Sequence, residues 1–374
     1  MNPALLKQIP HSPAFVLDID QVLTNLQSLH SIRYATACKV LYSIKALPLT
    51  SLLHELTGHV DGFSVSSLFE AKLARSVLGI SGSVHLTTPG LRPDEFAELA
   101  GLCSHISFNS LSQLQHLADR ATGYSKGVRV NPKLSCAADA RYDPCRRHSK
   151  LGVAVELLNR ALTEDVAGLH IHTVFGQTDS QPLQAIVQTL KPILQQRRLQ
   201  WLNLGGGYLY HRFADLQPII ELITDLKTGY VDDVYLEPGK GLVGNAGYLL
   251  TTVLDRFVSD GKTVLIMDTS INHHPEVFEY QQQPVLLDAQ ADGQHLAVLA
   301  GSTCLAGDLF GEYRFDTLPA IGDKLLLAEV GAYSLIKANR FNGYPLPTVY
   351  QLQDQTLKLL KRDDYADYCR QWLI

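Results

Sequence analysis

The alternation of apolar and amphipathic stretches along the first two-thirds of the chain predicts a parallel β/α structure. From about residue 39, short apolar runs typical of buried strands alternate with stretches of helical period. The segments with strand character are Val40–Ile44, Gly62–Val65, Val84–Thr87, His105–Asn109, Val128–Asn131, Leu169–Val174, Trp201–Leu204 and Val234–Glu237. Because strand and helix alternate eight times, the pattern predicts an α/β fold built on a (β/α)8 barrel, the TIM barrel.

The pattern changes after the barrel, where strand-like runs follow one another without long helices between them. These runs are Tyr248–Arg256, Thr263–Met267, Pro284–Leu287, Leu296–Ala300 and Lys324–Glu329. We therefore expect a barrel over residues 20–245 and a C-terminal all-β domain over residues 246–374. Residues 1–19 are expected to contribute a strand, Ala14–Asp18, to the β domain.

Composition and charge favour a soluble protein. The 374 residues can form two domains, and 46% of them are hydrophobic, so a large core is available. The formal net charge of −5 argues against a nucleic-acid partner, which needs a basic surface. No apolar run reaches the ~18 residues of a membrane helix, and no signal peptide is apparent. We therefore expect a cytoplasmic protein that binds neither nucleic acid nor membrane.

The cysteines and histidines show no metal-binding pattern. None of the six cysteines forms a CxxC pair or a zinc-ligand spacing. The adjacent His273 and His274 favour a loop, because neighbouring histidines rarely chelate one ion. Cys304 stands out because it lies four residues before Asp308 in the glycine-rich stretch Gly301–Asp308. The glycines permit tight turns, so this predicted loop can present its thiol as a proton donor or a nucleophile.

Residues at the ends of three predicted strands indicate a site for pyridoxal 5′-phosphate (PLP). A (β/α)8 barrel carries its chemistry at the carboxyl ends of the strands. Lys45 ends the first strand, and a lysine of shifted pKa can form a Schiff base. Gly205–Gly207 end the seventh strand, where backbone amides can wrap a phosphate. Glu237 ends the eighth, where a carboxylate can keep the cofactor ring nitrogen protonated.

Motifs along nearly the whole chain resemble those of one enzyme family. They are YSIKA (42–46), DGFSVSSLFEAKLA (61–74), GLHIH (168–172), NLGGG (203–207), EPGKGLVGNAG (237–247), GSTCLAGD (301–308) and GAYSLIKANRFNG (331–343). Together they resemble the fold type III PLP decarboxylases, which include ornithine, diaminopimelate and carboxynorspermidine decarboxylases. Further motifs resemble the carboxynorspermidine/carboxyspermidine decarboxylase subgroup, namely RVNP (129–132), YDPC (142–145), SKLG (149–152), MDTSI (267–271) and CLAGDLFGEYRF (304–315).

The resemblance implies a role for each matching residue. Lys45 would form the Schiff base, His172 would stack on the cofactor ring, and Glu237 would pair with the ring nitrogen. The implied cofactor-binding set is Lys45, Arg129, His172, Gly205, Gly206, Gly207, Glu237, Gly239 and Tyr333, with Tyr333 and the glycines at the phosphate. His170 shares a strand face with His172 and is assigned a structural role.

The resemblance also implies a homodimer with active sites shared across the interface. Cys304 and Asp308 would reach each site from the partner subunit. The substrate would form an external aldimine with the cofactor and lose CO2, and Cys304 would then protonate Cα. This assigns the thiol as a proton donor, since PLP already supplies the covalent chemistry.

The implied substrate is a carboxylated polyamine, either carboxynorspermidine or carboxyspermidine, which would yield norspermidine or spermidine. Its buried ammonium groups need acidic partners, and the candidates are Asp308, Glu276 and Asp179. Two departures from the family pattern leave the substrate open. Lys240 stands where the amino-acid decarboxylases usually have arginine, and the loop Thr173–Asp179 differs from that of the subgroup.

Three alternatives keep the cofactor but change the function. The first is a related decarboxylase of diaminopimelate, ornithine, lysine or a siderophore or secondary-metabolite intermediate. The second is an alanine-racemase-like enzyme, which would need an arginine in place of Glu237 and a tyrosine in place of Cys304. The third is a non-catalytic PLP-binding barrel, against which the β domain argues.

Overall fold

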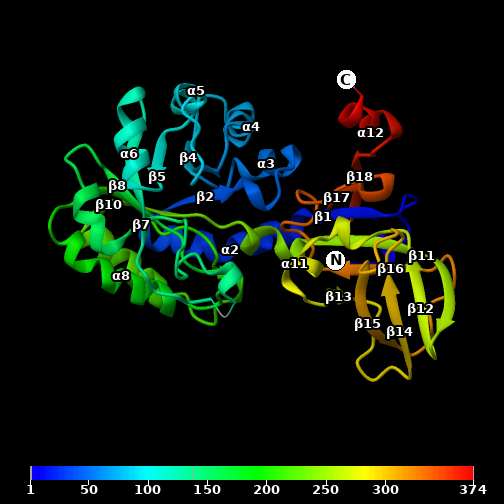
Figure 1. The fold of residues 1–374 in the computed structure, drawn as a ribbon. Coiled ribbons are helices and arrows are strands. Elements are labelled where there is room, and N and C mark those ends of the chain that lie inside the picture. Colours follow the sequence, from blue (N-terminus) through cyan, green and yellow to red (C-terminus); the bar gives the residue numbers. More distant parts are fainter. Residues whose placement is uncertain (1, 138, 374) are drawn as a thin grey trace. The chain divides into compact units, whose positions relative to one another are not determined.

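The computed structural model describes residues 2–137 and 139–373 (Figure 1). Met1 and Ile374, the outer ends of the predicted domain ranges, lie outside this part. The chain divides into two compact units, one formed by Asn25–Leu242 and the other by Met1–Thr24 together with Val243–Ile374. We call these the barrel unit and the β unit.

The barrel unit contains a closed ring of parallel strands. In the described part of the chain, the strand order is β5-β4-β3-β2-β10-β9-β8-β6, and β5 also pairs with β6, which closes the ring. The strands are β2 (Lys39–Ser43), β3 (Gly62–Val65), β4 (Ser83–Thr87), β5 (His105–Phe108), β6 (Ser125–Asn131), β8 (Gly168–Ile171), β9 (Leu199–Asn203) and β10 (Val231–Leu236). A short β7 (Val153–Ala154) pairs with β6. The predicted (β/α)8 barrel is confirmed.

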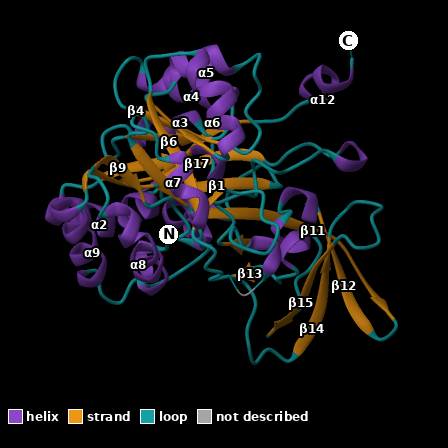
Figure 2. Cartoon of the chain, turned by 60° about the vertical axis from the view of Figure 1, so that its left-hand side comes forward, coloured by secondary structure: helices purple, strands orange, loops and turns teal. Residues whose placement is uncertain are grey.

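Helices alternate with the barrel strands along the chain and surround them (Figure 2). They include α2 (Ile19–Thr36), α3 (Thr50–Leu56), α4 (Leu68–Leu78), α5 (Phe96–Leu102), α6 (Leu111–Leu117), α7 (Leu158–Ala161), α8 (Gln181–Leu194) and α9 (Gln217–Gly229). Local sequence explains where several begin. Ser67 and Ser110 accept hydrogen bonds from the backbone of the first turns of α4 and α6. A proline stands in the first turn of both α8 and α9, where no backbone donor is needed.

Aromatic rings and histidines fill the barrel interior. The ring of His85 on β4 stacks on His105 at 3.9 Å and lies 6.0 Å from Trp201 on β9. β4 and β5 are neighbours in the sheet, whereas β4 and β9 are not, so the His85–Trp201 contact crosses the barrel. Trp201 fits because Gly127 and Gly168 face it: a Cβ on either glycine would lie 2.1 Å from the indole. The glycines therefore belong to the core packing of the barrel.

The β unit is built on a mixed sheet of order β15-β14-β12-β11-β1-β17-β18, with β16 pairing with β11 and β13. Its strands are β1 (Ala14–Asp18), β11 (Gly247–Ser259), β12 (Lys262–Met267), β13 (Val285–Leu286), β14 (His295–Ala300), β15 (Leu309–Phe315), β16 (Lys324–Ala328), β17 (Thr348–Gln353) and β18 (Thr356–Lys361). β1 runs antiparallel to β11 and parallel to β17. Its short helices are α1 (Pro3–Leu6), α11 (Glu276–Tyr280) and α12 (Tyr365–Trp372). Both α2 and α10 (Lys240–Val243) cross the boundary between the units. In the described chain, no helix has the length and apolar character to span a membrane.

Candidate active site

Lys45 stands directly after β2, in a short 3-10 turn at Ile44–Ala46. Its side chain is exposed to solvent, whereas Ile44 and Ala46 are buried. The surrounding protein nevertheless desolvates the ammonium group and lowers the pKa of Lys45, with Glu237 opposing and Arg129 adding to this shift. The ammonium group is therefore accessible to solvent and also surrounded by protein atoms. A lowered pKa increases the fraction of neutral amine, the form that attacks an aldehyde.

The glycine triplet after β9 leaves no room for side chains. Gly205 and Gly207 have φ values of 67° and 94°, in the left-handed region. A Cβ on Gly205, Gly206 or Gly207 would lie 2.0–2.2 Å from a backbone oxygen of Ile171, Glu237 or Val174, respectively. The loop thus packs backbone against backbone at the ends of the neighbouring strands.

Two amides of the triplet are engaged within the protein. The Gly205 amide donates to Asn203 Oδ1 at 2.9 Å, and the Gly206 amide donates to His172 Nδ1 at 3.1 Å. Phosphate binding by the triplet stays a prediction. The geometry shows that this loop holds the side chains of Asn203 and His172 in place.

His172 is held as a neutral ring. Because Nδ1 accepts the Gly206 amide, this nitrogen carries no proton. Burial lowers the pKa of His172 far below its ordinary value, and the charges of Lys45 and Arg129 lower it further. Arg129 Nη2 donates to the His172 carbonyl at 3.2 Å. A neutral imidazole with a fixed plane is suited to stacking on an aromatic cofactor.

Glu237, which follows β10, is a buried carboxylate with two hydrogen-bond partners. Oε1 accepts from Asn203 Nδ2 at 2.7 Å, and Oε2 lies 3.2 Å from His170 Nε2. Burial alone would raise its pKa, but His170 and then Lys45 outweigh burial and hold the pKa below its usual range. Glu237 is therefore ionised, as a partner for a protonated ring nitrogen must be.

Sequence reasoning missed the contribution of His170 and Asn203. The structural role assigned to His170 omits its hydrogen bond to Glu237. Two signals pointed to these residues: His170 shares a strand face with His172, and Asn203 immediately precedes the glycine triplet. Neither signal gives a distance, so neither could identify Glu237 as the shared partner.

The loop after Glu237 closes tightly on the end of β2. A Cβ on Gly239 would lie 3.2 Å from the Cβ atoms of Ser43 and Ala46, the residues that flank the Lys45 turn. The Ser43 amide donates to the Pro238 carbonyl at 2.9 Å. The barrel unit therefore brings together an amine of lowered pKa, an ionised carboxylate, a neutral histidine and the tight loop Gly205–Gly207, which we call the glycine cradle. This set of groups fits PLP.

The segment between β14 and β15 carries Cys304, whose side chain is exposed. Its backbone amide donates to Asn342 Oδ1 at 2.8 Å. The Ser302 carbonyl accepts from the Tyr344 hydroxyl at 2.8 Å. Two side chains from the 341–344 stretch therefore fix the backbone around the thiol. The predicted loop ends at Asp308, because Leu309–Phe315 form β15.

Asp308 is buried in its own loop, with only 2% of its surface exposed. Oδ1 accepts from the Ile271 amide at 2.8 Å, and Oδ2 accepts from the Thr303 amide and hydroxyl at 3.1 and 2.5 Å. A Cβ on Gly301 would lie 2.2 Å from this carboxylate, which explains the glycine there. Within the β unit, Asp308 therefore holds the Cys304 loop in shape.

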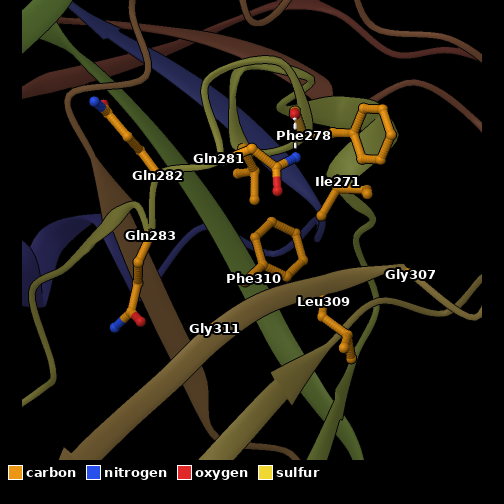
Figure 3. Close-up of a pocket in the computed structure, with 10 residues that line it drawn as sticks. Ile271, Phe278, Gln281, Gln282, Gln283, Gly307, Leu309, Phe310 and Gly311 are labelled. Carbon is orange, nitrogen blue, oxygen red and sulfur yellow. Dashed lines mark hydrogen bonds between the residues drawn. The ribbon is translucent and has the colours of Figure 1, made fainter.

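A pocket of about 370 Å³ borders this loop (Figure 3). The side chains of Ile271 and Phe310 converge on it, and Gly307 lies at its edge. Its other lining residues are Val277, Phe278, Gln281, Gln282, Gln283, Leu309 and Gly311. This lining contains no charged side chain, so it cannot pair with an ammonium group.

The other two acidic candidates have different surroundings. Asp179 is exposed, and its Oδ1 accepts the Gln181 amide at the start of α8. Glu276 is buried, with 5% of its surface exposed. After burial, Glu276 is the next cause of the raised pKa values of Tyr280 and Tyr333, the latter reaching about 12. Glu276 is therefore close enough to both phenols to act on their ionisation, and all three residues belong to the β unit.

Comparison with known proteins decides the family. The family model described as "Pyridoxal-dependent decarboxylase, C-terminal sheet domain" matches residues 14–331. This chain belongs to the pyridoxal-dependent decarboxylases. The predicted enzyme class and the predicted cofactor, PLP, are thereby confirmed.

Curated decarboxylases match over nearly the full chain. The carboxynorspermidine/carboxyspermidine decarboxylase of Herminiimonas arsenicoxydans is 30% identical, with 96% of this chain and 98% of that protein covered. The carboxyaminopropylagmatine decarboxylase of Synechocystis is also 30% identical, with 98% and 96% covered.

A solved decarboxylase structure agrees in fold. The carboxynorspermidine decarboxylase of Campylobacter jejuni, complexed with norspermidine, superposes with a TM-score of 0.88 at 28% identity. The match covers 96% of this chain and 100% of that structure. The fold type III family predicted from the motifs is confirmed.

Proposed function

We propose that this decarboxylase converts carboxynorspermidine or carboxyspermidine to norspermidine or spermidine. The supporting observation is the near full-length similarity to enzymes of that activity, one of which has been solved with norspermidine bound. A second candidate substrate is carboxyaminopropylagmatine, because the enzyme named for it is equally similar at 30% identity. The candidates share a carboxylated, polycationic character.

The barrel residues prepare the site for the cofactor. PLP, when bound, supplies an electron sink for the negative charge left at Cα by loss of CO2. Lys45 would hold the cofactor aldehyde and later release the product amine. Glu237 would keep the ring nitrogen protonated, and His172 would cover the ring face. Gly205, Gly206, Gly207, Gly239 and Arg129 of the barrel unit, together with Tyr333 of the β unit, would complete the cofactor-binding set.

Cys304 is the proposed proton donor to Cα, with its exposed Sγ carrying the proton. We infer a homodimer in which Cys304 of the partner subunit completes each site. Asp308 would act there by shaping the Cys304 loop, because its oxygens already accept three hydrogen bonds.

Glu276 is the best supported of the three proposed ammonium anchors. A buried carboxylate beside two phenols can stabilise a desolvated ammonium group, whereas the exposed Asp179 remains hydrated. We further propose a cytoplasmic location with no nucleic-acid or membrane partner. Six cysteines without a disulfide, all within the described residues, are typical of a reducing compartment.

A substrate panel tests this proposal. The PLP-loaded protein is incubated separately with carboxynorspermidine, carboxyspermidine, carboxyaminopropylagmatine, diaminopimelate, ornithine and lysine, and CO2 release is measured. We expect the highest kcat/KM with one of the first two. Release from carboxyaminopropylagmatine alone would favour the second candidate, and release from an amino acid alone would overturn the polyamine assignment.

A further inference from the structure

We propose that Asn203 is a positioning residue that couples the carboxylate at the cofactor ring nitrogen to the glycine loop. This inference rests on the PLP site of the barrel unit and does not depend on the substrate. It assigns a task to a residue that lies outside the predicted cofactor-binding set.

The side-chain amide of Asn203 makes two hydrogen bonds in opposite senses. Its Nδ2 donates to Glu237 Oε1 at 2.7 Å, and its Oδ1 accepts from the Gly205 amide at 2.9 Å. Asn203 is the last residue of β9 and is 1% exposed, so solvent cannot substitute for either partner. One planar group therefore sets the separation between the carboxylate and the glycine turn.

A backbone bond reinforces the same link, because the Glu237 amide donates to the Gly205 carbonyl at 2.8 Å. His170 Nε2 lies 3.2 Å from the second oxygen of Glu237. Each carboxylate oxygen thus has one protein partner, and a free lone pair remains for a ring N–H. The carboxylate cannot rotate without breaking one of these bonds.

The chemistry of the amide makes the proposal testable by substitution. Asn203→Leu has a similar size but can neither donate nor accept, so both bonds are lost. Asn203→Asp can still accept the Gly205 amide, but it donates to Glu237 only when the new carboxyl is protonated. The two carboxyls would then share one proton, as closely spaced acids do.

Asn203→Asp should therefore introduce a new pH dependence of PLP binding. The other charged or titratable groups that act on Glu237 are His170, Lys45, His85, Arg129 and His172, and all of them are unchanged in the variant. At low pH the proton shared by the new carboxyl group and Glu237 replaces the N–H that Asn203 donates to Glu237 in the wild type. As the pH rises, that proton is lost, the two carboxylates repel, and the cradle is distorted.

Asn131 provides a matched control. It ends β6, is 2% exposed, donates to the Leu151 carbonyl at 3.1 Å and accepts the Lys133 amide at 2.9 Å. Asn131→Asp makes the same chemical change at a strand end, but neither partner of Asn131 is a carboxylate. It controls for a general loss of stability.

The experiment measures the Kd of the apo-proteins for PLP from pH 6 to pH 9, with thermal melting of each apo-protein in parallel. We expect Asn203→Asp to bind near wild type at the acid end and to weaken by about tenfold per pH unit above the pair's transition, the slope of one linked proton. Asn203→Leu should bind weakly at every pH. Asn131→Asp should follow the wild-type profile.

A double variant separates coupling from simple damage. Asn203→Asp combined with Glu237→Gln has one carboxyl, so the new pH dependence should disappear. The proposal is overturned if Asn203→Asp follows the wild-type profile, if Asn131→Asp shows the same slope, or if the slope survives in the double variant. If Asn203→Leu does not fold, the variants that contain Asn203→Asp still test the proposal, because PLP binding at low pH shows that their site is folded.

Discussion

Burial sets the protonation states of the residues proposed to meet the cofactor. Desolvation by the surrounding protein lowers the pKa values of Lys45 and His172, which favours a neutral amine and a neutral imidazole. Glu237 is the exception, because His170 and Lys45 outweigh its desolvation and keep it ionised. Three residues in one barrel thus reach three states suited to different tasks.

Replacing Lys45 should remove the covalent link to the cofactor. We expect PLP-loaded Lys45→Ala to lose the visible absorbance of the lysine-bound cofactor and essentially all activity. Lys39→Ala is the control, because Lys39 lies on β2, the strand that leads to Lys45, but forms a partly exposed ion pair with Asp233 that is worth about 0–1 kcal/mol. An unchanged spectrum of Lys45→Ala would remove Lys45 from the mechanism.

Replacing Cys304 should change the product as well as the rate. Loss of a general acid typically costs about 10²–10⁴-fold in rate, and in Cys304→Ala the proton should go to the cofactor carbon, giving an aldehyde. Product analysis by mass spectrometry, with Cys369→Ala as the control, checks this. Normal amine yield and rate in Cys304→Ala would exclude the thiol as proton donor.

The ends of three barrel strands position the proposed cofactor-binding residues. β2, β9 and β10 end within two residues of Lys45, Gly205 and Glu237, respectively. The short turns that follow these strands have little freedom, because the glycines approach neighbouring backbone atoms closely. The geometry of the site is therefore set by strand ends and not by long mobile loops.

A single methyl group in the glycine cradle should disrupt it. Gly205→Ala places Cβ 2.0 Å from the Ile171 oxygen at a φ of 67°. We expect a loss of roughly 1–3 kcal/mol in unfolding free energy and a weaker affinity for PLP. Gly90→Ala, whose Cβ would meet nothing within 4 Å, should leave both unchanged. Urea unfolding and PLP titration measure the two effects. Equal unfolding free energies and equal PLP affinities of Gly205→Ala and Gly90→Ala would contradict the proposed role of the glycine cradle.

The barrel strands were predictable because each is a buried apolar run bounded by a helical pattern. β18 was not predicted, because no residue of Thr356–Lys361 is buried and its leucines do not alternate strictly with polar residues. β15 was missed because its buried residues Phe310, Tyr313 and Phe315 follow a glycine-rich motif. At the site, Lys45 and Glu237 could be identified from the sequence because each stands at the end of a predicted strand. The hydrogen bonds of Glu237 to His170 and Asn203 could not, because they depend on distances in the folded protein.

At the scale of the whole molecule, each unit contains a histidine that the surrounding protein keeps neutral. Burial lowers the pKa of His105 in the barrel unit and of His273 in the β unit to about 4. A histidine with a folded pKa below its unfolded value is stabilising at neutral pH. That contribution is lost as the pH falls from the unfolded pKa of about 6.5 toward the folded value.

Folding stability should therefore decrease on mild acidification. We expect each of these histidines to cost about 2 kcal/mol of unfolding free energy at pH 5 relative to pH 8. Urea unfolding of the apo-protein at both pH values measures the difference. Equal unfolding midpoints at pH 8 and pH 5 would show that the histidines are not held neutral.

Shared active sites make a quantitative prediction about mixed dimers. If Lys45 and Cys304 of one site belong to different subunits, a dimer of Lys45→Ala and Cys304→Ala chains has one intact site. Random exchange then restores about a quarter of wild-type activity, because half the dimers are mixed and each has one of two sites intact. Lys45→Ala mixed with Glu237→Gln, both in the barrel, should recover nothing. No recovery in the first mixture would contradict the shared site.

The most direct test of the central claim is the reaction of the PLP-loaded enzyme with carboxynorspermidine or carboxyspermidine in D2O. We predict release of one CO2 per substrate and a polyamine product with one non-exchangeable deuterium at the former Cα, detected by mass spectrometry. Absence of CO2 from both substrates, or a product without deuterium at that carbon, would contradict decarboxylation followed by Cα protonation.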